Sequence, residues 1–172
     1  MYDYLLYFLI FSFFGWCAEV IFYFLKTGEF VNRGLAKGPV CPIYGIGICL
    51  SSILLSSIDS FLLLVLFSMA VATIVEFLVG LFLDKVIGQR LWDYRGEKGN
   101  ILGYVCPTFS LIWGIVAAMV IKLLPLLTPF VNLMKTPLGY AFAFVLSVAI
   151  LVDVELQMVE MKKAKKISIG GE

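Results

Sequence analysis

The sequence has 172 residues, of which 62% are hydrophobic and 15% are charged, and its formal net charge is +1. Soluble domains carry nearer a quarter charged residues, so this composition is typical of a membrane protein. The balanced charge argues against nucleic acid as a partner. Without any histidine, Ser-His-Asp and Cys-His catalysis and His-ligated metals are excluded. Phosphate-binding loop motifs are missing too, so we expect no metal or cofactor, and ATP-driven work would need a partner subunit.

Five apolar segments predict five transmembrane helices, because about 20 apolar residues cross a hydrocarbon core of about 30 Å. In chain order they are Tyr4–Leu25, Ile43–Ile58, Phe61–Leu83, Tyr104–Leu127 and Leu138–Met161. The second is short, and we expect it to extend back through the Cys41–Pro42 step. The first has no basic residues before it, so we expect it to be retained rather than cleaved. The sequence thus predicts an all-α membrane protein with one integral membrane domain over residues 1–172.

Lysine and arginine are distributed unevenly between the two sides of the predicted helices. The segments 26–42 and 84–103 and the tail after residue 161 hold nearly all of them, and only Lys122 and Lys135 fall on the other side. Cytoplasmic loops carry this excess, so we expect an external N-terminus and a cytoplasmic C-terminus in a bacterial cell membrane. The tail lysines at 162–166 are expected to bind anionic lipids. The stretch 126–137 is predicted to be an interfacial connection.

A pattern of residues occurs twice along the chain. Each copy has a glutamate on a helix, then Arg-Gly, then Gly-x-Val-Cys-Pro-x-aromatic-small, which ends at Gly45 in the first copy and at Ser110 in the second. Both copies are helix, cytoplasmic loop and helix, so both run the same way through the membrane. This predicts two parallel repeats, at about 4–58 and 61–127, followed by a fifth helix and a basic tail over 138–172.

The glutamates of the two copies, Glu19 and Glu76, are predicted to lie inside the membrane. A charged acid there costs a few kcal/mol, so it faces the protein interior and finds a partner. One interpretation is that Arg33 and Arg95 fold in from the loops and pair with them. The other is that both acids line a cavity open to the cytoplasm. The two interpretations are about equally favoured by the sequence, and Asp153 is expected to need only water or the tail lysines.

Cysteines and aromatic residues give further candidates. Cys41 and Cys106 each precede a proline that resembles the first residue of a helix. A thiol at a helix N-terminus can be reactive, although buried packing is its commoner role. Trp16, Trp92 and Tyr94 could form an aromatic wall beside the acids, with Trp113, or serve only as packing and interface anchors.

Several motifs resemble those of the CmpB family of small bacterial multi-pass membrane proteins. In the first half they are Phe14-Gly15-Trp16, Glu19-Val20, Phe30-Val31-Asn32-Arg33-Gly34 and Gly38-Pro39-Val40-Cys41-Pro42-Ile43-Tyr44-Gly45. In the second half they are Ala72-Thr73, Glu76, Trp92-Asp93-Tyr94, Asn100, Gly103, Cys106, Phe109-Ser110 and Trp113-Gly114. The resemblance covers about residues 10–115 and implies a permease of ABC-transporter type IV. Candidate binding residues from these motifs are Glu19, Glu76, Arg33, Arg95, Asn32, Asn100, Trp16, Trp92, Asp93, Tyr94 and Tyr44.

Three functions compete at this stage. The leading hypothesis is a transporter-like protein that binds a small polar or charged solute or a lipid head group, alone, as a homo-oligomer or with an ATPase subunit. The second is an intramembrane enzyme acting on lipid-linked substrates, with Glu76, Asp93 or Cys106 in the acid–base or nucleophile role. The third is a non-catalytic scaffold in which the polar network is structural. Membrane lipids are partners in all three.

Overall fold

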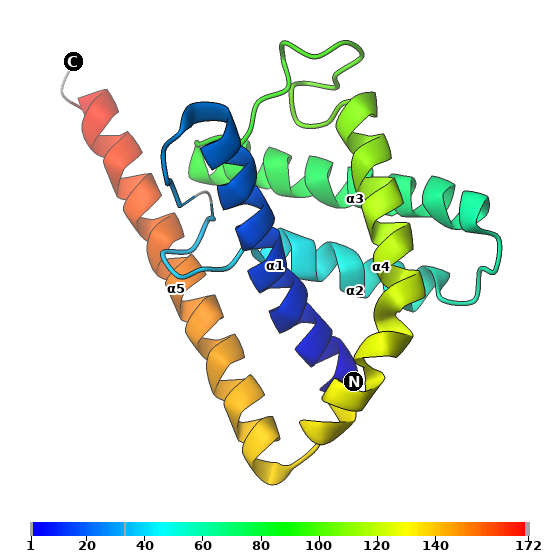
Figure 1. Cartoon of the computed structure of the whole chain (residues 1–172). Helices are drawn as coiled ribbons and strands as arrows, with labels where there is room; N and C mark the ends of the chain where they lie inside the picture. Colours follow the sequence, from blue (N-terminus) through cyan, green and yellow to red (C-terminus); the bar gives the residue numbers. More distant parts are fainter. Residues whose placement is uncertain (1, 33, 171–172) are drawn as a thin grey trace.

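The elements of the chain are helices joined by two long loops (Figure 1). The computed structural model describes residues 2–32 and 34–170, with side chains described as far as residue 164. The helices are α1 (Tyr2–Thr27), α2 (Pro42–Leu55), α3 (Phe61–Phe82), the π-helical turn η1 (Leu83–Ile87), α4 (Pro107–Leu133) and α5 (Pro137–Gly170). Over the residues described, the only β-type pairing is an isolated bridge between Ile101 and Val105. The predicted all-α class is confirmed.

Four of these helices are long and apolar enough to cross a membrane: Tyr2–Thr27, Phe61–Ile87, Pro107–Leu133 and Pro137–Ala164. The fifth, α2, has 14 residues, which at 1.5 Å per residue is about 21 Å. It begins at Pro42, where the fixed φ of proline suits the first helical position. It ends at Leu55, three residues before the predicted end at Ile58. By length alone the described chain therefore provides four spans and a shorter apolar helix.

The connection expected at 126–137 is mostly helical. Helix α4 continues through Pro125 and Pro129 to Leu133, so only residues 134–136 link it to α5. Each proline removes one backbone donor, but a spacing of four places both on one side of the helix. Membrane helices tolerate such losses because neighbouring groups satisfy the freed carbonyls. The sequence therefore predicted that the helix ends before Pro129, but in the structure it continues to Leu133.

Small residues bring the helices of each half close together. A Cβ on Gly15 of α1 would lie 2.3 Å from Tyr44 Cγ of α2, and one on Gly114 of α4 would lie 2.7 Å from Met69 Cβ of α3. Helix backbones approach in this way where glycine replaces a larger side chain. Figure 1 shows α2 and α3 side by side, with α4 crossing α3. Over the described residues, α2 packs against α3, whereas α1 and α4 are not in extensive contact.

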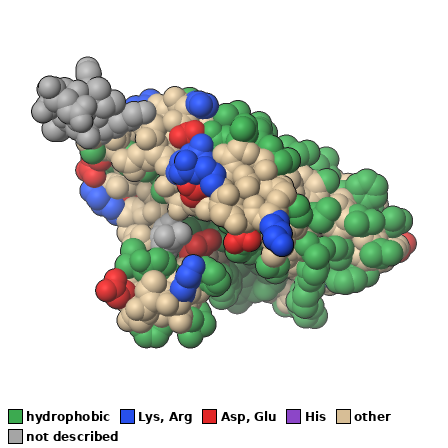
Figure 2. Space-filling view, turned by 90° about the horizontal axis from the view of Figure 1, so that it is seen from above, with side chains coloured by type: hydrophobic (Ala, Val, Ile, Leu, Met, Phe, Trp, Pro, Cys, Tyr) green, Lys and Arg blue, Asp and Glu red, His purple; other side chains and the backbone are tan. Residues whose placement is uncertain are grey.

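The interior is polar at several places and the outside is apolar. Buried polar residues include Ser12, Ser51, Ser68 and Glu76, while many leucines and phenylalanines are exposed, among them Leu62 and Phe144. Soluble proteins have the opposite arrangement. Figure 2 shows the charged side chains gathered mainly at one end of the face it presents, with a largely hydrophobic body beyond them. Exposed apolar side chains on long helices are what lipid contact requires.

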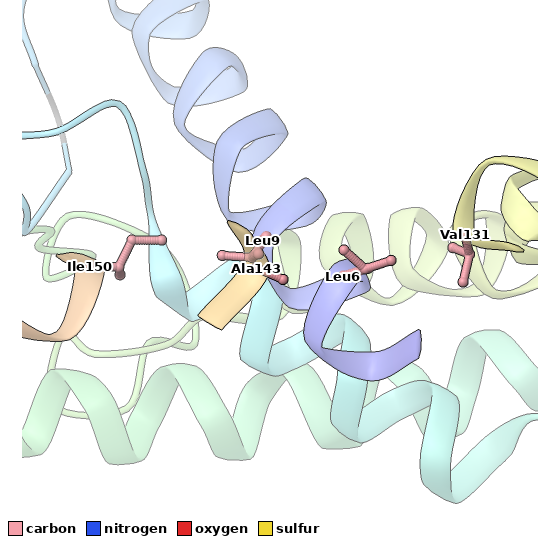
Figure 3. Packing of buried hydrophobic residues seen from close by; sticks show 5 residues of the cluster. All are labelled: Leu6, Leu9, Val131, Ala143 and Ile150. Atoms are coloured by element: carbon pink, nitrogen blue, oxygen red, sulfur yellow. The ribbon is translucent and has the colours of Figure 1, made fainter. Parts of the chain in front are cut away.

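Helix α5 attaches along α1 and the end of α4. Leu6 and Leu9 of α1, Val131 of α4 and Ala143 and Ile150 of α5 form one buried cluster (Figure 3). Beside this cluster the Lys135 ammonium lies 2.9 Å from an Asp3 carboxylate oxygen. Near the middle of α5, Asp153 accepts a hydrogen bond of 2.8 Å from the Gly38 N–H. Asp153 thus anchors the first loop, whereas solvation had been expected.

Candidate functional site

A cavity of about 370 Å³ lies among the helices at the end that carries the two long loops. Its walls come from α1, α2, α3, α4 and α5 and from both loops. Most of the lining is apolar, and the charged, hydroxyl-bearing or aromatic members are Glu19, Tyr44, Ser51, Glu76, Phe82, Trp92, Tyr94 and Trp113. A pocket of this size and composition, with a few convergent polar groups, is the usual form of a small-molecule site.

Glu19 of α1 faces this cavity together with Tyr44 of α2. The Tyr44 hydroxyl donates to Glu19 Oε1 at 2.5 Å. Close contact of the two helices makes this pair, because Gly15, one helical turn before Glu19, leaves room for the Tyr44 ring. The Tyr44 ring also meets Trp113 of α4 edge to face, with centroids 5.2 Å apart. Glu19 is therefore held by the Tyr44 hydroxyl, and the Tyr44 ring is itself packed against Trp113 of α4.

Glu76 of α3 has a phenol partner too, but from a loop. The Tyr94 hydroxyl donates to Glu76 Oε1 at 2.8 Å. Burial, and secondarily the charge of Glu76, raise the pKa of Tyr94, which keeps its proton available for donation. Glu76 is 7% exposed. Its Oε2 has no hydrogen-bond partner of ordinary geometry among the described residues, although Trp113 is a near neighbour.

The two acid–phenol pairs come from different positions of the repeated motif. Tyr44 is the aromatic residue three positions after Cys41, and the matching residue after Cys106 is Phe109, which has no hydroxyl. Tyr94 stacks on Phe109, with centroids 4.8 Å apart and 18° between the ring planes. The second half therefore places a loop tyrosine over the phenylalanine, and the loop supplies the hydroxyl that the helix supplies in the first half.

The predicted pairing of Arg95 with Glu76 is not present. Arg95 binds Asp93, two residues before it, through both carboxylate oxygens, and its side chain is 70% exposed. Hydrogen bonds from Arg95 lower the pKa of Asp93 to about 2. Arg95 therefore pairs within its own turn, because it reaches the Asp93 carboxylate without burying its guanidinium group. Arg33 lies outside the described residues, and its pairing with Glu19 stays a prediction.

The remaining polar candidates organise the loops. Asn32 accepts from the Trp16 indole at 2.8 Å and donates to the Lys37 carbonyl at 2.9 Å. Asn100 donates to the Glu97 carbonyl at 2.8 Å and accepts from the Gly103 N–H at 3.0 Å. None of these side chains lines the cavity. Trp92 does line it, and its indole donates to the Tyr104 carbonyl at 2.8 Å.

The two cysteines begin helices as predicted. Cys41 precedes Pro42 of α2 and Cys106 precedes Pro107 of α4, and each proline is at the first turn. Cys41 is 5% exposed and lines the cavity, whereas Cys106 is 1% exposed and lies outside the lining. In the part of the chain that the structure describes, no three Cys, Asp or Glu side chains come together as a metal site. The structure thus places only one of the two thiols at the cavity.

A second polar cluster, which the sequence did not indicate, fixes the second loop to the end of α3. Asp84, on the π-helical turn η1, accepts from Arg90 at 3.0 Å and from the Tyr104 hydroxyl at 2.5 Å. The Arg90 guanidinium also lies over the Tyr104 ring, 4.6 Å from its centroid. Gly103 has a φ of 75°, and a Cβ there would lie 2.6 Å from Arg95 Cγ. This cluster holds Trp92 and Tyr94 over the cavity, and its long-range pairing with Tyr104 has no short sequence signature.

Long apolar helices, an apolar exterior and a partly polar interior define a multi-pass helical membrane protein. A family model described as "Putative ABC-transporter type IV" (CmpB) matches residues 6–158. The chain belongs to this family, which confirms the resemblance seen in the motifs and places it among transporter-type membrane proteins. No similar chain was found among curated proteins or among solved structures.

Proposed function

We propose that the chain is a permease-like protein that binds a small polar or charged solute, or a lipid head group, in the central cavity. One observation carries this proposal: Glu19 and Glu76, one from each half, both line the same hollow. Intramembrane carboxylic acids are costly, and those that face a protein cavity mark solute or ion pathways. The phenol partners orient the two acids and leave acceptor capacity for a ligand.

In the proposed topology all five helices cross the membrane as two parallel repeats and a fifth helix, within one domain over residues 1–172. Support comes from the sorting of contacts to two ends. Lys122 donates to the Ile58 carbonyl and Lys135 pairs with Asp3 at one end. Both long loops lie at the other, where Lys37 pairs with Glu160. The basic residues near the long loops would then be cytoplasmic, and the N-terminus would be external.

With this orientation the cavity opens toward the cytoplasm between the two loops. Leu35 of the first loop and Leu91, Trp92 and Tyr94 of the second line it. A solute would enter and leave at this end. The partners that we propose are membrane lipids and either a second copy of the chain or an ATPase subunit, because the sequence has no nucleotide-binding motif of its own.

The test is binding and uptake by the full chain with Glu76→Gln. This variant removes a charge while keeping the shape of the side chain and the hydrogen bond from Tyr94. We expect it to abolish solute uptake and binding while the amount of folded protein in the membrane stays the same. Glu160→Gln, which is 59% exposed in its pair with Lys37, is the matched control and should behave as the wild type.

A second variant tests the cavity without touching an acid. Gly47 lines the cavity, and a Cβ there would meet no atom within 4 Å. Gly47→Leu should therefore fold and fill the hollow, and solute binding should be lost. A scaffold role would instead leave function intact in both Glu76→Gln and Gly47→Leu. Loss of the folded protein in Glu76→Gln alone would mean that the acid is structural.

A further inference from the structure

We infer that the solute of this cavity is a small organic cation, a protonated amine attached to an apolar body. The inference rests on the proposed function, since it assigns a ligand class to the same site. It excludes, for this site, anionic solutes and phosphate head groups, which the proposed function alone allows. Charge, unpaired acceptors and aromatic faces point to it independently.

The charges around the cavity are acidic. Glu19 and Glu76 line it, and they are close enough to repel one another. Among the lining residues that the structure describes there is no lysine or arginine. Arg90 instead pairs with Asp84 of η1, and Arg95 pairs with Asp93 of the second loop. Two carboxylates in a low-dielectric site attract a cation and repel a phosphate, because Coulomb energies there exceed those in water.

Hydrogen-bonding capacity at the cavity is unused on the acceptor side. Glu76 is 7% exposed and Ser51 is 1% exposed, and both line the cavity. Ser51 Oγ has no hydrogen-bond partner among the described residues, and Glu76 Oε2 has none of ordinary geometry, with Trp113 as its near neighbour. A buried acceptor left unpaired is unfavourable, and more so if it is charged. An ammonium group with N–H donors can relieve this cost after a small rotation of the Glu76 side chain, whereas a quaternary ammonium has no donor to offer.

The rest of the wall suits the carbon skeleton of such a ligand. Tyr44 and Trp113 meet edge to face at the cavity, and Trp92 and Tyr94 line it from the second loop. A cation over an aromatic face within about 6 Å of the ring centroid is attracted by the ring quadrupole. The remaining lining is mainly aliphatic, from α2, α3 and α4. A fully hydrated metal ion would gain nothing from contact with this apolar surface, whereas the carbon skeleton of an arylalkylamine would be buried against it.

The experiment is calorimetric titration of the purified full chain with four probes that share a phenyl ring and differ in the polar group on a short linker. They are phenethylammonium, phenethyl alcohol, phenylacetate and phenethyltrimethylammonium. We expect phenethylammonium to bind, and each other probe to bind at least tenfold more weakly. Glu76→Gln and Glu19→Gln should each weaken phenethylammonium at least tenfold, while Glu160→Gln should leave its Kd unchanged. A melting curve for each variant shows that it is folded.

The outcomes separate this inference from the proposed function. If phenylacetate or the alcohol binds as tightly as the amine, the cation assignment is overturned. If Gly47→Leu also blocks that binding, the cavity is still a solute site and the proposed function stands. Equal binding of the trimethyl probe would overturn the requirement for N–H donors. If no probe binds the wild type at millimolar concentration, the inference is wrong for this class of amine-bearing ligand.

Discussion

Tyr94 lies nearly parallel to Phe109, with ring centroids 4.8 Å apart. The stacking fixes a loop residue on the first turn of α4, and the same tyrosine donates its hydroxyl to Glu76. Phe109 occupies the place that Tyr44 holds in the first half, so the two halves reach one chemical arrangement by different residues.

Tyr94→Phe separates the two roles of this tyrosine. The ring would still stack on Phe109, so the second loop should keep its place. Glu76 would lose its hydrogen bond at 2.8 Å, leaving a buried acceptor unpaired at a cost of about 1–3 kcal/mol. We expect a lower melting temperature in detergent, measured by intrinsic fluorescence. Tyr4→Phe is the control, because Tyr4 is 36% exposed; equal loss in both variants would contradict the assignment.

Gly15→Ala tests the close approach of α1 and α2. Its Cβ would lie 2.3 Å from Tyr44 Cγ, so the helices must separate or the ring must move, at about 1–3 kcal/mol. Gly47→Ala, also on a helix, meets no atom within 4 Å and should be neutral or stabilising by up to about 1 kcal/mol. Thermal unfolding of the two variants compares them directly. Similar melting temperatures of the two variants would contradict the close contact between Gly15 and Tyr44.

Asp93 should titrate well below an ordinary aspartate. Its pKa is lowered to about 2 by hydrogen bonds from Arg95, against about 3.9 in an unfolded chain. A lowered pKa in the folded state stabilises the loop above about pH 4, and this contribution is lost as the pH falls through about 2. Carboxyl carbon NMR of aspartate-labelled protein measures the titration, with Asp93→Asn to assign the signal. In Arg95→Gln the pKa should rise toward 3.9; an unchanged value would contradict the pairing.

Asp153→Ala should loosen the first loop at its contact with α5. The Gly38 N–H loses its acceptor at 2.8 Å, and a hydrogen bond to a charged but partly exposed group is worth about 1 kcal/mol here. Exchange of the Gly38 amide hydrogen should then be about fivefold faster, as measured by mass spectrometry. Glu160→Ala removes a more exposed contact of the same loop, with Lys37, and should change exchange less than twofold. The reverse order would contradict the anchoring role of Asp153.

The sequence was sufficient for the main lines of the fold, because apolar segments and proline placement are local signals. The Cys-Pro step at Cys41 and at Cys106 marked two helix starts, and both were confirmed. Pro129 misled in the opposite direction, because a proline inside a helix and one after its end look alike without the packing around them. The end of α2 was also set too late, at Ile58.

The partners of the acids could not be predicted in the same way. Arg95 was a reasonable candidate for Glu76 on charge alone, but Asp93 is only two residues away and holds it. Tyr94 lies 18 residues from Glu76 along the chain. The sequence pattern does not indicate that the second loop folds back onto α3 and brings Tyr94 to this acid. Long-range pairs such as Asp84 with Tyr104 depend on the backbone path of the loop, which sequence spacing does not encode.

The most direct test of the account asks whether the hollow between the halves is open to a polar cation. In a chain whose four native cysteines are replaced by serine, Gly47→Cys is treated with cationic and anionic methanethiosulfonate reagents. Gly47 lines the cavity, whereas Leu54 on the same helix is 61% exposed on the apolar exterior, so Leu54→Cys is the control. We expect Gly47→Cys to react, several times faster with the cationic reagent, and Leu54→Cys to stay unmodified in the membrane. A folded Gly47→Cys protein that neither reagent modifies, or that the anionic reagent modifies faster, would contradict the account.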